Sequence, residues 1–258
     1  MLINTLFLFL LELLPLFLFS ALVVSVVSLS PFKSALIIRS YLIGFGLGLL
    51  LITAVDYISM AFDGRGLELF MFSISFIQVF SFTLYLYLGS PHRHAKHLIA
   101  VVMILITMTT SVNFLSYFTV LWQSQGASQA LLLGAIIGAG FSASLAVLLY
   151  FFVMLIEKYM PLISLFITGV FLTGQLANKT NLLAQIGLID GEVFWSTEAI
   201  FSEQTVVGHV LRSLVGYEAT PIHWQVYTYV FVLLGLSLIL IYKKPQLMSA
   251  IPKGEVSK

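Results

Sequence analysis

Long apolar runs follow one another along this chain, and the shorter segments between them carry most of its charge. A helix of about 20 apolar residues crosses the hydrocarbon core of a bilayer, which is roughly 30 Å thick. Of the 258 residues, 60% are hydrophobic and only 9% are charged. A water-soluble fold needs many more polar side chains on its surface. The chain is therefore predicted to be an all-α, polytopic membrane protein.

The apolar runs predict seven transmembrane helices that form a single transmembrane domain. The first run has no basic leader and no obvious cleavage site, so we expect it to be retained as a helix. Pro15 lies within it and is expected to kink it. The predicted helices cover 2–29, 32–55, 67–88, 96–122, 129–156, 161 to about 177, and 225–242.

Basic residues are concentrated in alternate loops, near Lys33 and Arg39, in 91–97, at Lys158 and in the tail at 243–258. Cytoplasmic loops carry the excess of lysine and arginine in membrane proteins. We therefore expect the N-terminus to lie outside and the C-terminus to lie in the cytoplasm.

The first three predicted helices and the next three can be laid over each other as two copies of one unit. An odd number of spans per unit inverts the second copy, as in transporters, whose sites lie near the midplane between the repeats. Glycines are concentrated in the second helix of each unit, at Gly44, Gly46, Gly48, Gly134, Gly138 and Gly140. Because glycine is common in membrane helices in general, ordinary packing is the alternative explanation. The predicted division is repeat one at about 1–90, repeat two at about 95–178, an outer loop at about 179–224, a last helix at about 225–242 and a cytoplasmic tail at 243–258.

Composition and motifs exclude several classes of function. The chain has no cysteine, which removes disulfides and thiolate metal sites, and its net charge of +1 gives no basis for binding nucleic acid. It contains no nucleotide-binding glycine loop, Ser/His/Asp arrangement or HExxH motif. We expect neither an enzyme nor a permanently bound cofactor, and the lipid bilayer is the first partner.

Polar residues inside the predicted spans are few, and Glu12 is the only acidic residue well inside one. A charged side chain at the bilayer centre costs about 2.5–3.5 kcal/mol, so such groups face partners or a cavity. Serine, threonine and asparagine also hold helices together by hydrogen bonds, which is the alternative role. Glu12 is the candidate metal ligand. The candidates for a transport pathway or an ion-binding site are Glu12, Gln78, Thr109, Thr110, Asn113 and Gln175.

Charged residues in the loops offer further candidates. An acidic outer surface gathers cations, although surface charges on a folded cap are the alternative. His92, His94 and His97 have a spacing that suits a transition metal, but a solvated connector explains them as well. The candidates for an outer vestibule are Asp56, Asp63, Glu68, Glu198 and Glu203.

The segment that follows the sixth predicted helix contains a distinctive set of residues: Trp195, Ser196, Thr197, Ser202, Glu203, Gly208, Leu211, Leu214, Gly216, Tyr217, Pro221 and Tyr227. This set resembles the signature of the oxidase-dependent iron permease family, which includes the yeast high-affinity iron permease and the bacterial ferrous iron uptake permeases. The resemblance implies a seven-helix protein of the bacterial inner membrane, iron as the transported ion and a periplasmic iron-handling partner.

The family's iron chemistry rests on an Arg-Glu-x-x-Glu motif in helices one and four, and this chain departs from it. The paired carboxylates of that motif offer the hard oxygen ligands that iron accepts. The matching run at 11–15 keeps only Glu12, and the run at 109–113 contains neither arginine nor glutamate. A dehydrated ferric ion would find little compensating charge there.

Two functions follow from this mixture of likeness and difference. The first is a divergent permease that moves iron or another small cation by alternating access, with Glu12 as its surviving acid. The second is a non-transporting accessory or assembly subunit, which has kept the scaffold, lost the iron site and binds other membrane subunits. A fold alone does not decide between them.

Overall fold

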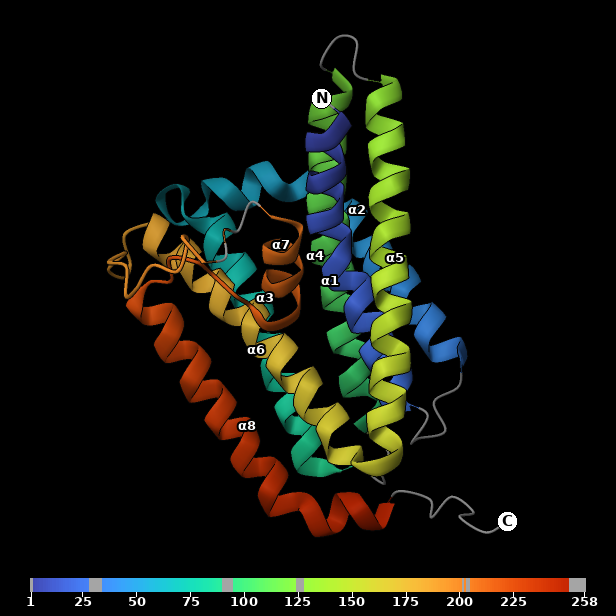
Figure 1. Cartoon of the computed structure of the whole chain (residues 1–258). Helices are drawn as coiled ribbons and strands as arrows, with labels where there is room; N and C mark the ends of the chain where they lie inside the picture. The colour runs from blue at the N-terminus through green and yellow to red at the C-terminus, as the bar shows by residue number, and fades with distance from the viewer. Residues whose placement is uncertain are drawn as a thin grey trace.

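The computed structural model describes residues 2–27, 34–89, 95–123, 128–200, 202 and 205–250. Seven helices in these ranges are long and apolar enough to cross a membrane, and α7 is a shorter helix between the last two (Figure 1). The prediction of an all-α polytopic membrane protein is confirmed. The helices are α1 (Leu2–Val27), α2 (Ser34–Gly64), α3 (Gly66–Leu88), α4 (Ala95–Gln123), α5 (Ser128–Tyr159), α6 (Pro161–Gln185), α7 (Val206–Val215) and α8 (His223–Ala250).

The helices form two groups that lean against each other. The first group contains α1, α2, α4 and α5, and the second contains α3, α6 and α8. Figure 1 shows α7 between the two groups, where it contacts α6 on one side and α1 on the other. The groups meet mainly where α3 packs on α4 and on α2, and α6 makes smaller contacts with α1 and α5.

Contacts between helices follow the pattern of an inverted repeat. We call α1, α2 and α3 the first triplet and α4, α5 and α6 the second. Because α1 packs on α5 and α2 packs on α4, the first helix of each triplet pairs with the second helix of the other. The first helices also contact each other, as α1 with α4, and the third helices do the same, as α3 with α6. Exchanging the triplets leaves this set of pairs unchanged, which is what a two-fold axis in the membrane plane produces.

In two of these helix pairs, glycines lie at the contact between the backbones. We call these two contacts the glycine seams. In the first seam, Gly44 and Gly48 of α2 lie against α4, and in the second, Gly134 and Gly138 of α5 lie against α1. A Cβ atom at Gly44 would stand 2.7 Å from the Ile104 carbonyl oxygen, too close for any real side chain. Small residues four apart let two helix backbones approach each other in this way.

The remaining glycines of the predicted set do not pack. A Cβ atom at Gly46 or Gly140 would meet nothing within 4 Å. Both therefore point away from the seams, and general glycine enrichment in membrane helices explains them.

The predicted end of the sixth helix was wrong. α6 continues to Gln185, whereas the sequence analysis ended it at about residue 177 because polar residues follow. The helix continues because these side chains find partners: the Thr180 hydroxyl donates to the Ala177 carbonyl, and the Asn178 amide binds a side chain of α8.

Other boundaries also differ from the prediction. The outer loop predicted at about 179–224 contains the end of α6, all of α7 and the start of α8. α8 extends to Ala250 rather than to 242. α2 extends to Gly64, although Phe62 and Asp63 have left-handed backbone angles, with φ values of 53° and 58°, that turn the chain into α3.

Candidate functional site

A polar cleft lies where the two helix groups meet. It consists of two adjoining cavities of about 450 Å³ and 60 Å³. The residues that line both cavities are Glu12, Pro15, Asn113, Gln175 and Lys179. We call the two cavities together the polar cleft.

Helices that correspond between the two triplets build the cleft. α1 contributes Glu12 and its counterpart α4 contributes Asn113, while α3 contributes Gln78 and its counterpart α6 contributes Gln175. The cleft therefore lies between the two predicted repeats, and inverted-repeat transporters hold their substrates at such a junction.

All six residues that the sequence analysis named for a pathway or ion site line this cleft. Their role in transport stays a prediction, but their convergence from four helices is a finding. The lining includes Glu12, Gln78, Thr109, Thr110, Asn113 and Gln175.

Glu12 accepts a hydrogen bond from the side chain of Asn113. The two residues belong to the runs at 11–15 and 109–113, which the resemblance predicts to stand at the Arg-Glu-x-x-Glu positions. These two runs therefore face each other across the cleft. Pro15 frees the carbonyl of Leu11 from its helical hydrogen bond, because proline has no N–H, and Leu11 lines the larger cavity.

The sequence analysis missed the basic residues of the cleft. Lys179 lines both cavities, and Arg212 lines the larger one. Lys179 was assigned to an outer loop because the sixth helix was ended too early. The available signal was its spacing: it lies four residues after Gln175, which places both side chains on one face of a helix that continues.

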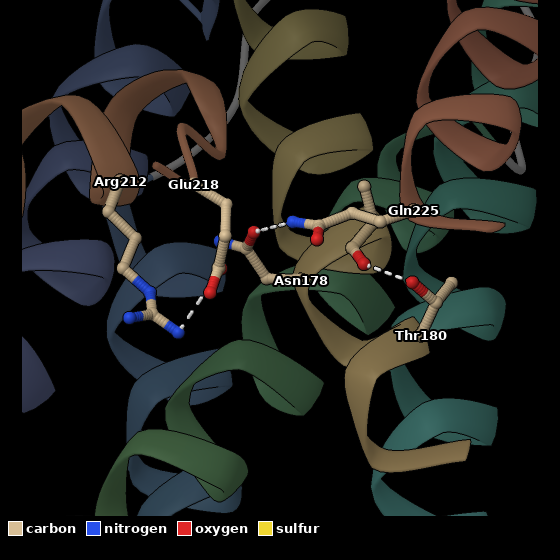
Figure 2. A network of polar contacts seen from close by, with 6 residues as sticks. Asn178, Thr180, Arg212, Glu218 and Gln225 are labelled. Atoms are coloured by element: carbon tan, nitrogen blue, oxygen red, sulfur yellow. Dashed lines mark hydrogen bonds and ion pairs between the residues drawn. The ribbon is translucent and has the colours of Figure 1, made fainter. Parts of the chain in front are cut away.

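An ion pair closes one side of the larger cavity. Arg212, in the last turn of α7, places a guanidinium nitrogen 3.5 Å from a carboxylate oxygen of Glu218, as Figure 2 shows. Glu12 attracts both Lys179 and Arg212 over a longer range. The larger cavity is thus lined by two acidic side chains, Glu12 and Glu218, and by two basic ones, Lys179 and Arg212.

α7 is docked onto α6 at close range. The Gln175 amide donates a hydrogen bond of 3.0 Å to the Ser213 carbonyl. The backbones of Gly174 and Gly216 meet directly, since a Cβ atom at Gly174 would stand 2.5 Å from the Gly216 nitrogen. Gly216 also needs its left-handed φ of 72° to end α7. These contacts make α7 a fixed wall of the cleft.

Further polar contacts tie the neighbouring segments together. The Gln225 amide of α8 donates a 2.8 Å hydrogen bond to Asn178 of α6, next to the Arg212–Glu218 pair in Figure 2. The hydroxyls of Thr197 and Tyr217 lie 2.7 Å apart. Thr197 and Tyr217 belong to the stretch that resembles the iron permease signature. The same stretch contains α7, and it lines the larger cavity with Arg212, Ser213 and Glu218.

The vestibule candidates lie elsewhere. Asp56, Asp63 and Glu198 are exposed, and neither they nor Glu68, in the first turn of α3, line the cleft. Their role in gathering cations stays a prediction. Glu203 lies outside the described residues.

The histidine loop is only partly described. His92 and His94 lie outside the described residues, and His97 is exposed at the start of α4. Within the described ranges, no group of three or more His, Cys, Asp or Glu side chains is placed to hold a metal ion.

Searches against protein-family models, curated proteins and solved structures find no match to this chain. The case for function therefore rests on the cleft and on the resemblance of the signature stretch.

Proposed function

We propose that this chain is a membrane transporter rather than an enzyme, and that a small charged solute passes through the polar cleft. The observation that carries the proposal is the position of the cleft, at the junction of two inverted triplets. Charged side chains inside a membrane domain are costly and mark solute or ion pathways. Alternating access moves one repeat against the other around such a site.

The resemblance to the iron permeases makes iron, or another small cation, the first cargo to test. Glu12 is the proposed contact for a cation. The presence of Lys179 and Arg212 in the same cavity opposes a multivalent cation, because a buried ion needs compensating charge of the opposite sign. A periplasmic iron-handling protein is the proposed partner if iron is carried.

The test is uptake of radiolabelled ferrous and ferric iron into proteoliposomes that contain the purified chain. Iron transport through the cleft predicts saturable uptake that falls at least tenfold in Glu12→Gln. Glu192→Gln makes the same chemical change at an exposed position outside the cleft and should leave uptake unchanged. Equal uptake by both variants, or uptake no higher than that of empty vesicles, would remove iron transport through this cleft.

A second function is an accessory subunit of a membrane complex. The observation that favours it is the loss of charge at the runs 11–15 and 109–113, where Glu12 is the single remaining acidic residue. It predicts that the folded chain carries out no uptake by itself and co-purifies in stoichiometric amount with another membrane protein.

The proposed location is the bacterial inner membrane with the N-terminus outside. The absence of cysteine makes the orientation easy to measure with single introduced cysteines. We expect a membrane-impermeant thiol reagent, added to intact cells, to label Glu198→Cys and not His97→Cys. The opposite result would invert the proposed topology.

A further inference from the structure

The cleft contains polar groups whose partners are missing from the described part of the chain. The Lys179 ammonium lines both cavities and, among the described residues, takes part in no hydrogen bond or close ion pair; it is only attracted by Glu12 over a longer range. Asn181 lines the larger cavity, and its buried side-chain oxygen accepts no hydrogen bond from any described residue. One is a cationic donor and the other is a neutral acceptor.

Leaving such groups without partners is costly in a membrane interior. A buried polar group without a hydrogen bond loses the contacts it made with water, and an unpaired buried charge is more costly still. Water or a ligand has to supply the missing contacts. A ligand that satisfies both groups carries an acceptor for Lys179 and a donor for Asn181.

The distribution of formal charge narrows the chemistry of that ligand. Arg212 and Glu218 already form a pair at 3.5 Å on one side of the larger cavity. Glu12 and Lys179 face the remaining space from different helices, α1 and α6, and both line the smaller cavity as well. A bare cation would meet Lys179, and a simple anion would meet Glu12. A molecule with one charge of each sign satisfies both.

We propose that the polar cleft binds a small zwitterion of the α-amino acid type, with its carboxylate at Lys179 and its ammonium group between Glu12 and Asn181. The larger cavity, at about 450 Å³, lies within the 300–1,000 Å³ range of small-molecule sites. This inference rests on the proposed transport function and names its substrate class.

The first experiment measures binding rather than transport. The full chain in lipid nanodiscs is titrated by calorimetry with each of the twenty standard α-amino acids. For the tightest of them, the amine that lacks the carboxylate and the carboxylic acid that lacks the amino group are then titrated. We expect the zwitterion to bind at least tenfold more tightly than either. No binding by any amino acid, or equal binding by one of the truncated molecules, overturns the proposal.

Substitutions at Lys179 provide the second test. Lys179→Met should weaken binding of that amino acid at least tenfold, while Lys179→Arg, which keeps the charge, should retain most of it. Lys96→Met makes the same change at an exposed position at the start of α4 and should have no effect. Unchanged binding in Lys179→Met contradicts the proposal. If that variant does not fold, the comparison of the amino acid with its truncated forms, measured on the natural chain, still tests the proposal.

Failure of this inference is distinguishable from failure of the proposed function. Iron uptake that depends on Glu12, together with no binding of amino acids, rejects the zwitterion and leaves transport standing. Binding of an amino acid without uptake of that labelled amino acid into proteoliposomes supports the site and rejects transport.

Discussion

The glycine seams and the polar cleft share two helices, α1 and α4, and differ in how closely their helices approach each other. In the seams, α2 meets α4 and α5 meets α1 with no side chain from the glycines between the backbones. In the cleft, side chains of α1, α4, α6 and α7 surround a space of about 450 Å³. The contrast separates the surfaces that hold the fold together from the surface that is open to a ligand.

This difference leads to a general expectation about substitutions. Added volume in a seam has no free space to occupy, so it forces backbones apart and destabilises the fold. Loss of a polar group in the cleft removes a modest interaction, because hydrogen bonds between membrane helices contribute about 0.6 kcal/mol on average. Seam variants should therefore lose stability, and cleft variants should lose function first.

The largest effect is expected at Gly174, where a contact of the seam type occurs in the wall of the cleft. Gly174→Val places a side chain against the Gly216 backbone. A backbone cannot move aside by changing rotamer, as a flexible side chain can. We expect a loss of about 3 kcal/mol, measured as unfolding in mixed detergent micelles. Gly235→Val is the control, since a Cβ atom at Gly235 meets nothing within 4 Å. A similar loss of unfolding free energy in Gly174→Val and Gly235→Val would contradict the close backbone contact at Gly174.

A single methyl group tests the first seam. Gly44→Ala should destabilise the protein by about 2 kcal/mol, because the new atom would collide with Ile104 and Thr107 of α4. Gly46→Ala lies one half-turn away on the same helix, faces open space and should cost nothing. Chemical unfolding of the two variants side by side measures the difference. If Gly44→Ala proves as stable as Gly46→Ala, the seam is not closed as described.

The ion pair at the cleft should contribute less. Arg212→Met removes the ion pair with Glu218, and we expect a loss of about 1 kcal/mol, since the Arg212 side chain is 40% exposed and solvent weakens the pair. Glu218→Gln in the same background should recover most of this loss. A double-mutant cycle on unfolding free energies measures the coupling. A coupling near zero would show that the pair contributes nothing to stability.

The smallest effect is expected where α6 and α8 are linked. Gln225→Leu removes the hydrogen bond to Asn178 and should cost about 0.6 kcal/mol. Thr228→Val, on the next turn of α8, serves as the matched control. A loss in Gln225→Leu as large as that in Gly44→Ala would erase the distinction between seam and cleft.

Much of the fold was predictable because its signals are strong. Apolar runs of spanning length are unmistakable, and the GxxxG spacing of Gly44 with Gly48 and of Gly134 with Gly138 indicates close helix contacts. The partner of each glycine face was not predictable, since spacing indicates that a face packs and does not say against what. Identifying the partners required the positions of α1 and α4 in the structure.

The cleft was predicted in part for a related reason. Polar residues such as Gln78 and Asn113 are conspicuous inside apolar runs, and a hydrophobic environment requires them to converge. Lys179 was missed because a lysine near a helix end has the same sequence appearance whether it faces solvent or a cavity. Arg212 was missed because α7 has ten residues, too few to register as a span.

The seams also determine when this protein can assemble. Each seam joins a helix of the first triplet to one of the second, so α1 leaves the ribosome long before α5 exists to cover it. A nascent chain that ends after α3 has both seams open. Biogenesis therefore requires the early helices to be sheltered, by the insertion machinery or by lipid, until the second half arrives. A fragment that ends after α3 leaves uncovered the glycine face of α2 and the face of α1 on which α5 packs.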